Sequence, residues 1–167
     1  MSAPSRPNPS PSGAETAVAD VARERRAALQ ADARALGIYE ALISRLVDTF
    51  YDRVRRDATL GPIFEQAIGD HWDPHLERMK AFWSSVALNT GRYSGKPVPA
   101  HRKLTGVHPA HFDHWLALLR QTLADIAPND AAADHFLTRA ERIAESLQLA
   151  MFGMAAPRRR PASRAQS

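Results

Sequence analysis

The spacing of apolar residues along the chain is that of α-helices. Residues 38–56 carry two adjacent rows of apolar side chains at helical intervals: Leu42, Leu46 and Phe50 in one row, and Ile43, Val47, Tyr51 and Val54 in the other. Two such rows form a broad apolar face, as expected for a helix that packs on a core. The pattern predicts a long amphipathic helix whose buried face has one hydroxyl group, that of Tyr51.

Weaker signals predict three further elements around this helix. Residues 16–36 are rich in Ala, Arg and Glu with few large apolar residues, and Gly37 is well placed to end them, so we expect a surface helix. The chain should then bend at Gly61-Pro62, form a short helix around Phe64 and stop at Gly69. Asp73 is expected to cap a helix whose first residue is Pro74.

Two more helices complete the predicted fold. Pro109 should begin a helix that runs to about Ala127, with Phe112, Leu116, Leu119 and Leu123 on its apolar stripe and Trp115 at the edge. Asn129 or Asp130 should cap the last helix, whose stripe holds Phe136, Ala140, Ile143, Leu147 and Met151. The sequence therefore predicts an all-α protein.

Composition divides the chain into one folded domain with two tails. Residues 1–14 are rich in Pro and Ser and should be disordered, residues 15–156 should fold as one domain, and residues 157–167 form a basic tail that we also expect to be disordered. The net charge of +4 comes from the four arginines of that tail, Arg158, Arg159, Arg160 and Arg164. The domain itself is electrically balanced, which argues against a nucleic-acid-binding protein.

Other classes are excluded by residues that the chain lacks. There is no cysteine, so disulfides, thiolate metal sites and cysteine nucleophiles are absent. No apolar stretch approaches the length of a membrane span, and the N-terminus lacks the apolar core of a signal peptide. We therefore expect a cytoplasmic protein without a membrane partner, as a monomer or weak dimer.

Two of the seven histidines stand in positions suited to metal binding. His101 lies in a segment stiffened by Pro97 and Pro99, which could present a neutral imidazole, a common axial ligand of haem iron. His75 shares a helix face with Met79, Phe82 and Val86, so its ring should point inward.

The remaining histidines have simpler interpretations. His71 and His75 have a spacing that could bind zinc, but Pro74 leaves His71 outside the helix. His108, His111 and His114 step by three residues, and we interpret them as surface residues open to adventitious metal binding.

Four motifs resemble those of one family. The segments FYDRVRRDATLGPIF, WDPHLERMKAFWSS, GRYSGKPVPAH and PAHFDHWLALL occur in the order found in truncated haemoglobins of group III, and the resemblance covers roughly residues 36–152. It implies a shortened globin, a two-over-two helical sandwich around haem b (iron protoporphyrin IX), here with an additional N-terminal helix. It also implies that the helix bearing the proximal histidine is reduced to a turn after a loop.

The resemblance suggests roles for individual residues. His101 would be the proximal iron ligand, while Tyr51, His75 and Trp115 would line the distal side. Three roles stay open for His75: hydrogen-bond donor, swinging gate or sixth iron ligand. Further pocket candidates are four apolar residues that would equally serve any helical core: Phe50, Phe64, Met79 and Phe82. Arg78 is a candidate to lie near a haem propionate, and Arg92 and Tyr93 are weaker candidates.

The implied function is reversible binding of O₂, NO, CO or a similar ligand, with redox chemistry on that ligand as its use. Hydrogen-bond donors from Tyr51 and Trp115 would stabilise partial negative charge on bound O₂. Oxidase, peroxidase or NO dioxygenase activity would require an external reductase, because the chain has no nucleotide-binding motif. The alternative is a cofactor-free helical interaction module that docks through its basic tail.

Overall fold

The computed structural model describes residues 13–153, and these residues form helices joined by turns. The helices are α1 (Gly13–Ala35), α2 (Glu40–Arg56), α3 (Leu60–Ile68), α4 (Trp72–Leu88), α5 (Pro97–Arg102), α6 (Pro109–Ile126) and α7 (Asp130–Phe152). The all-α prediction is confirmed for this part of the chain. Of the segments predicted to be disordered, only Gly13 and Ala14 are described, and both are helical. Among the described helices, none is both long and apolar enough to cross a membrane.

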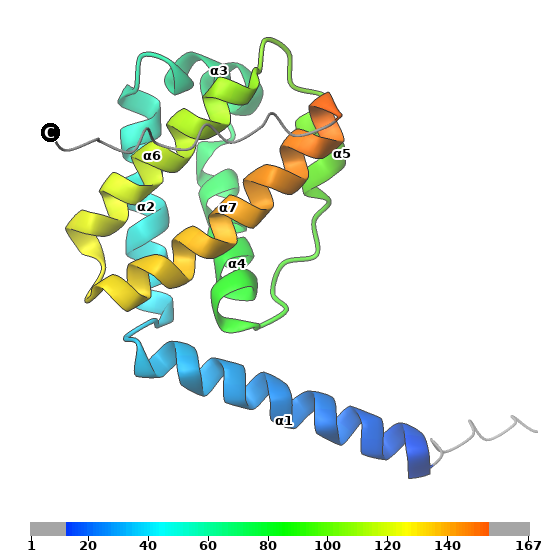
Figure 1. Cartoon of the computed structure of the whole chain (residues 1–167). Helices are drawn as coiled ribbons and strands as arrows, with labels where there is room; N and C mark the ends of the chain where they lie inside the picture. Colours follow the sequence, from blue (N-terminus) through cyan, green and yellow to red (C-terminus); the bar gives the residue numbers. More distant parts are fainter. Residues whose placement is uncertain (1–12, 154–167) are drawn as a thin grey trace, which may run out of the picture.

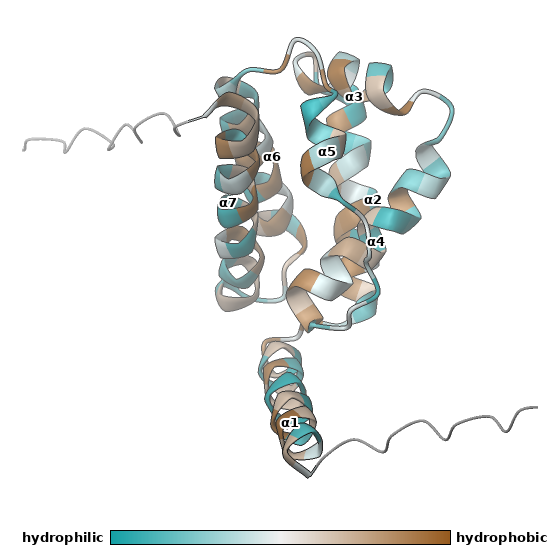
Figure 2. Ribbon diagram, turned by 90° about the vertical axis from the view of Figure 1, so that its right-hand side faces the viewer, coloured by the Kyte–Doolittle hydropathy of each residue, from teal (hydrophilic) through white to brown (hydrophobic). Residues whose placement is uncertain are grey.

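Two pairs of helices, α2 with α4 and α6 with α7, enclose the core (Figures 1 and 2). Helix α2 also packs against α6 and so joins the two pairs. The core is built from fully buried side chains of these helices, among them Ile43, Leu46, Val47, Phe50, Val54, Leu119, Leu123, Phe136 and Ala140. Burying these apolar faces supplies the main driving force for folding, and it produces the predicted two-over-two arrangement.

Helix α1 extends away from this helical body (Figures 1 and 2). Ala33 is its one buried residue, and Val18 and Val21 remain 70% and 66% exposed. Its Ala-rich sequence favours a helix by local propensity rather than by packing. The predicted surface helix is thus confirmed, and the chain leaves it at Gly37, whose φ of 86° suits glycine.

Two boundaries in the middle of the chain differ from the prediction. Gly61 and Pro62 lie inside the first turn of α3 rather than bending the chain before it. Proline is tolerated there because the first N–H groups of a helix have no intrahelical acceptor. Similarly, α4 begins at Trp72 with His71 at its N-cap, so Asp73 is a first-turn residue and not the cap.

The last two helices begin as predicted. Pro109 is the first residue of α6. Asn129 rather than Asp130 caps α7, because its side-chain oxygen accepts the backbone N–H of Ala132 at 2.8 Å. The Asn129 amide also donates to the Leu36 carbonyl at 3.0 Å, which ties the α6–α7 turn to the end of α1.

The C-terminal end of α4 is capped by side chains of α7. His135 donates from Nε2 to the Ala87 carbonyl at 3.1 Å, and Arg139 donates from Nε to the Val86 carbonyl at 3.2 Å. These carbonyls lie in the last turn, where a helix has no N–H donors of its own left to pair with them. Burial is the main cause that lowers the pKa of His135, which favours its neutral ring.

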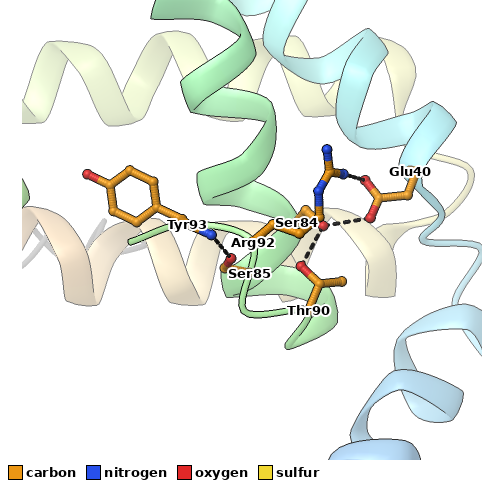
Figure 3. Close-up of polar contacts among 6 residues, drawn as sticks. All are labelled: Glu40, Ser84, Ser85, Thr90, Arg92 and Tyr93. Carbon is orange, nitrogen blue, oxygen red and sulfur yellow. Dashed lines mark hydrogen bonds and ion pairs between the residues drawn. The ribbon is translucent and has the colours of Figure 1, made fainter. Parts of the chain in front are cut away.

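A polar network holds the segment that leads from α4 to α5 (Figure 3). The fully buried Ser84 hydroxyl donates to Glu40 Oε1 at 2.6 Å and lies 2.8 Å from the Thr90 hydroxyl. Arg92 donates to the other oxygen of Glu40 at 3.2 Å. Because these contacts join the start of α2 to the residues after α4, they fix the direction in which the chain enters α5.

Candidate functional site

His101 lies on the short helix α5, not in a loop or turn as the sequence predicted. Pro97 is the first residue of this helix, where a missing N–H has no cost. The half-buried His101 ring lies with Nδ1 2.7 Å from the Pro97 carbonyl oxygen. A carbonyl can only accept, so Nδ1 carries the proton and donates. In the neutral ring the Nε2 lone pair is therefore available to a metal ion.

His75 faces the interior from α4, as predicted, with Met79, Phe82 and Val86 half-buried on the same helix face. Its Nε2 atom is the one buried side-chain polar atom among the described residues that has no hydrogen-bond partner. An unpaired buried nitrogen is costly, so it marks a position where a ligand would be stabilised.

The protonation of His75 is set by its surroundings. Burial is the largest effect, followed by the charges of Arg78 and His101, and together they lower the pKa of His75 to about 4. The ring is therefore neutral at pH 7.

Tyr51 and Trp115 join His75 in one aromatic cluster. Tyr51 is 5% exposed, and its ring lies edge-on to Phe50, Phe64 and His75, with ring centroids 5.2, 6.0 and 5.3 Å away. Phe50 links Trp115 to this group of rings, because the Trp115 ring centroid is 5.6 Å from that of Phe50. Burial raises the pKa of the Tyr51 hydroxyl well above its usual value, so it stays a proton donor.

An apolar cleft of about 230 Å³ lies between α4, α5 and α7. Its lining consists of Phe82, Pro97, Val98, Arg142, Ile143, Ser146 and Leu147. Pro97 and Val98 are one turn before His101, so the cleft adjoins the face of α5 that carries the ring. Apolar walls with one cation suit a flat apolar cofactor that bears acidic groups.

The contribution of α7 to this cleft was missed in the sequence. Ile143 and Leu147 were recognised as part of an apolar stripe, but the stripe has the same spacing whether its residues fill a core or line a cleft. Arg142 beside the stripe was the available signal, because a cation next to an apolar face can hold an acidic group.

The other predicted pocket residues lie in different surroundings. Arg78 is exposed, one turn beyond His75. Tyr93 packs edge-on against Phe82 at 5.1 Å and so reaches the neighbourhood of the cleft. Arg92 is instead engaged by Glu40 through an ion pair of 3.2 Å. The fold therefore brings Tyr93 to the site and directs Arg92 toward the start of α2.

A second groove, of about 290 Å³, lies apart from the predicted site residues. It is lined by Arg53, Arg56, Asp57, Leu118, Gln121 and Asp125. None of the predicted site residues belongs to it, and Arg53 is neutralised by Asp125 at 2.7 Å. The remaining histidines give no alternative metal centre, since the described residues contain no cluster of three or more His, Asp or Glu side chains suited to a metal ion.

Known proteins are similar to this chain in both sequence and fold. The model of the bacterial-like globin family matches residues 34–149. Group 3 truncated haemoglobin of Campylobacter jejuni is 35% identical over 114 residues, which cover 66% of this chain and 89% of that protein. The crystal structure of group III truncated haemoglobin from Campylobacter jejuni is similar with a TM-score of 0.65 at 33% identity, covering 69% of this chain and 92% of the other. These matches confirm the resemblance expected from the four motifs.

Proposed function

Because the chain belongs to the bacterial-like globin family, a family that implies haem binding, we propose that it binds haem b through His101 and holds O₂ or another diatomic ligand on the opposite side. The observation that carries the proposal is the state of two ring nitrogens. The Nδ1–H of His101 donates a hydrogen bond to the Pro97 carbonyl, which leaves Nε2 free to bind iron, and His75 has a buried Nε2 without a partner.

The residues present fit such a cofactor. Haem would supply an iron atom that binds diatomic ligands and exchanges electrons. The hydrogen bond from His101 to the Pro97 carbonyl fixes the ring orientation and increases the basicity of Nε2, as is usual for metal-bound histidines. Arg142 beside the apolar cleft and Arg78 on α4 are candidates to bind the propionates. The chain has no cysteine for thioether attachment, which favours haem b.

The distal cluster, by which we mean Tyr51, His75 and Trp115, would act on the ligand. Its members offer a hydroxyl, an imidazole and an indole N–H from three different helices, α2, α4 and α6. In an apolar setting, donors aimed at a partly negative acceptor are stronger than in water. His75 is neutral at pH 7, so it can donate a hydrogen bond or offer a lone pair as a sixth iron ligand.

We extend the proposal to redox chemistry on the bound ligand, such as oxidation of NO or reduction of peroxide. The three donors would stabilise negative charge that develops on the ligand during such a reaction. Turnover would need electrons from a separate reductase, because the folded domain is a globin without a nucleotide-binding motif.

The visible absorption spectrum tests the proposal. The purified protein should show haem bands in its ferric, ferrous and CO-bound forms, and His101→Ala should lose haem or regain the spectrum when imidazole is added. His71→Ala is the matched control, because His71 is an exposed N-cap residue without a side-chain cap bond. A colourless wild-type protein after reconstitution with haemin, or unchanged haem binding in His101→Ala, would contradict the proposal.

A further inference from the structure

Trp72, the first residue of α4, covers the distal cluster on the side of α2 and α3. Its side chain is nearly buried, with 6% of the residue exposed. The indole lies edge-on to both polar rings of the cluster, with centroids 6.4 Å from Tyr51 and 6.0 Å from His75. Trp72 therefore stands between the two rings and the exposed residues of the α2–α3 end.

Two exposed residues hold the indole from outside. Glu65 on α3 accepts the indole N–H through Oε2 at 2.9 Å. The guanidinium of Arg55 on α2 lies over the ring, 4.4 Å from its centroid. Both residues are exposed while the ring between them is buried, so the indole lies at the boundary between solvent and the aromatic cluster.

The turn between α2 and α3 sets the positions of these two partners. Asp57 Oδ1 accepts the backbone N–H groups of Thr59 at 2.9 Å and Leu60 at 2.8 Å. Gly61 packs so closely that a Cβ there would lie 2.8 Å from the Arg55 carbonyl oxygen. The backbone that carries Arg55 and Glu65 is thus tightly fixed, whereas their contacts with Trp72 are made by side chains that can rotate away.

We propose that Trp72 is the gate through which diatomic ligands reach the distal cluster, and that Arg55 and Glu65 are positioning residues that keep the gate closed. The inference rests on the proposed function. Each holding contact is weak at an exposed site, so the indole is held most of the time and can still swing outward. A gate of this size favours small ligands, because a larger one requires a wider displacement of the ring.

A gate has a kinetic signature that distinguishes it from the hydrogen-bond donors behind it. Opening the path changes the rates of entry and escape by the same factor and leaves the equilibrium affinity unchanged. Removing a donor to the bound ligand changes the escape rate and the affinity together. The two roles can therefore be separated by measuring association and dissociation on the same variant.

The test uses the haem-loaded full chain, with CO and n-butyl isocyanide as probes in flash-photolysis and ligand-displacement experiments. Arg55→Met and Glu65→Ala each remove one contact outside the core, and Trp72→Phe keeps a ring but removes the N–H donor. Each should raise the CO association and dissociation rates together by about fivefold, the rate equivalent of one such contact, and the isocyanide rates by more. Arg56→Met and Gln66→Ala, at exposed neighbouring positions, should leave all rates unchanged.

A second measurement does not depend on ligand kinetics. In the CO-bound protein, hydrogen exchange of the Trp72 indole N–H, followed by NMR, should speed up in Arg55→Met by a similar factor. Rates within twofold of wild type in all three variants, together with indole exchange within twofold of wild type in Arg55→Met and normal haem spectra, would overturn the gate while the proposed function stands. Absence of haem from the wild-type protein would overturn both.

Discussion

The hydroxyl of Tyr51 and the indole N–H of Trp115 should determine how long O₂ stays bound. Tyr51→Phe and Trp115→Phe test this. Tyr51 is almost fully buried among Phe50, Phe64 and His75, so its replacement by Phe removes one oxygen atom and keeps the ring contacts. Any change in ligand kinetics can then be attributed to the lost donor rather than to repacking.

The size of the effect follows from the environment of each donor. A hydrogen bond to a partly charged acceptor contributes ~1.5–3 kcal/mol, and each ~1.4 kcal/mol changes a rate tenfold. Tyr51→Phe should therefore speed O₂ dissociation by roughly 10- to 100-fold. Trp115 is only half-buried, which places it near the lower limit of that range. Because burial raises the pKa of Tyr51, the hydroxyl stays protonated and its effect should not vary between about pH 6 and pH 9.

The assay is stopped-flow displacement of O₂ by CO, with CO dissociation measured in parallel. CO is less polar when bound and should respond much less than O₂. The double variant should show less than the sum of the two effects, because both donors would share one acceptor. Tyr39→Phe, at a tyrosine that is 54% exposed, is the matched control. Equal and small changes for O₂ and CO in both variants would refute the reasoning and show that these side chains only fill space.

Two further predictions concern stability. Gly61→Ala should lower the free energy of unfolding by ~1–3 kcal/mol in chemical denaturation, because the new Cβ would lie 2.8 Å from the Arg55 carbonyl oxygen. Gly13→Ala is the control, since a Cβ at that position would have nothing within 4 Å. An unchanged free energy of unfolding in Gly61→Ala would contradict the close contact. His135 has a pKa below the unfolded value of about 6.5, so its contribution to stability is present above about pH 6.5 and is lost as the pH falls through the folded pKa. His135→Gln keeps a donor for the Ala87 carbonyl without titrating. The free energy of unfolding of this variant, measured with urea, should therefore fall less on acidification than that of wild type. Equal falls in the two proteins would exclude His135 as the cause.

The features predicted correctly from the sequence are those specified by local signals. The start of α6 at Pro109 and the cap at Asn129 depend on residues within one turn of the helix end, and a sequence displays such residues directly. The inward direction of His75 followed from helical spacing alone. The ordered set of four motifs then led to the globin family, which the family match confirms.

The features that were missed depend on contacts between distant segments. The sequence shows Trp72 and Glu65 seven residues apart, but only the packing of α4 against α2 brings Arg55 over the same ring. Arg92 could not be separated from the pocket candidates before its partner Glu40 was seen, 52 residues away. The helical state of His101 was also missed, because two prolines near a short segment fit a loop as well as a first turn.

The hydrogen bond within α5 makes the candidate iron ligand a self-contained unit. The donor His101 and the acceptor Pro97 are four residues apart on a helix of six residues, so the unit requires no partner from elsewhere to define its tautomer. A ligand that depends on a distant acceptor can be placed only in a scaffold that supplies the acceptor as well. The segment Pro97–Arg102 could instead be transplanted onto an unrelated helical bundle, with an oriented imidazole included, as a compact building block for designed haem proteins.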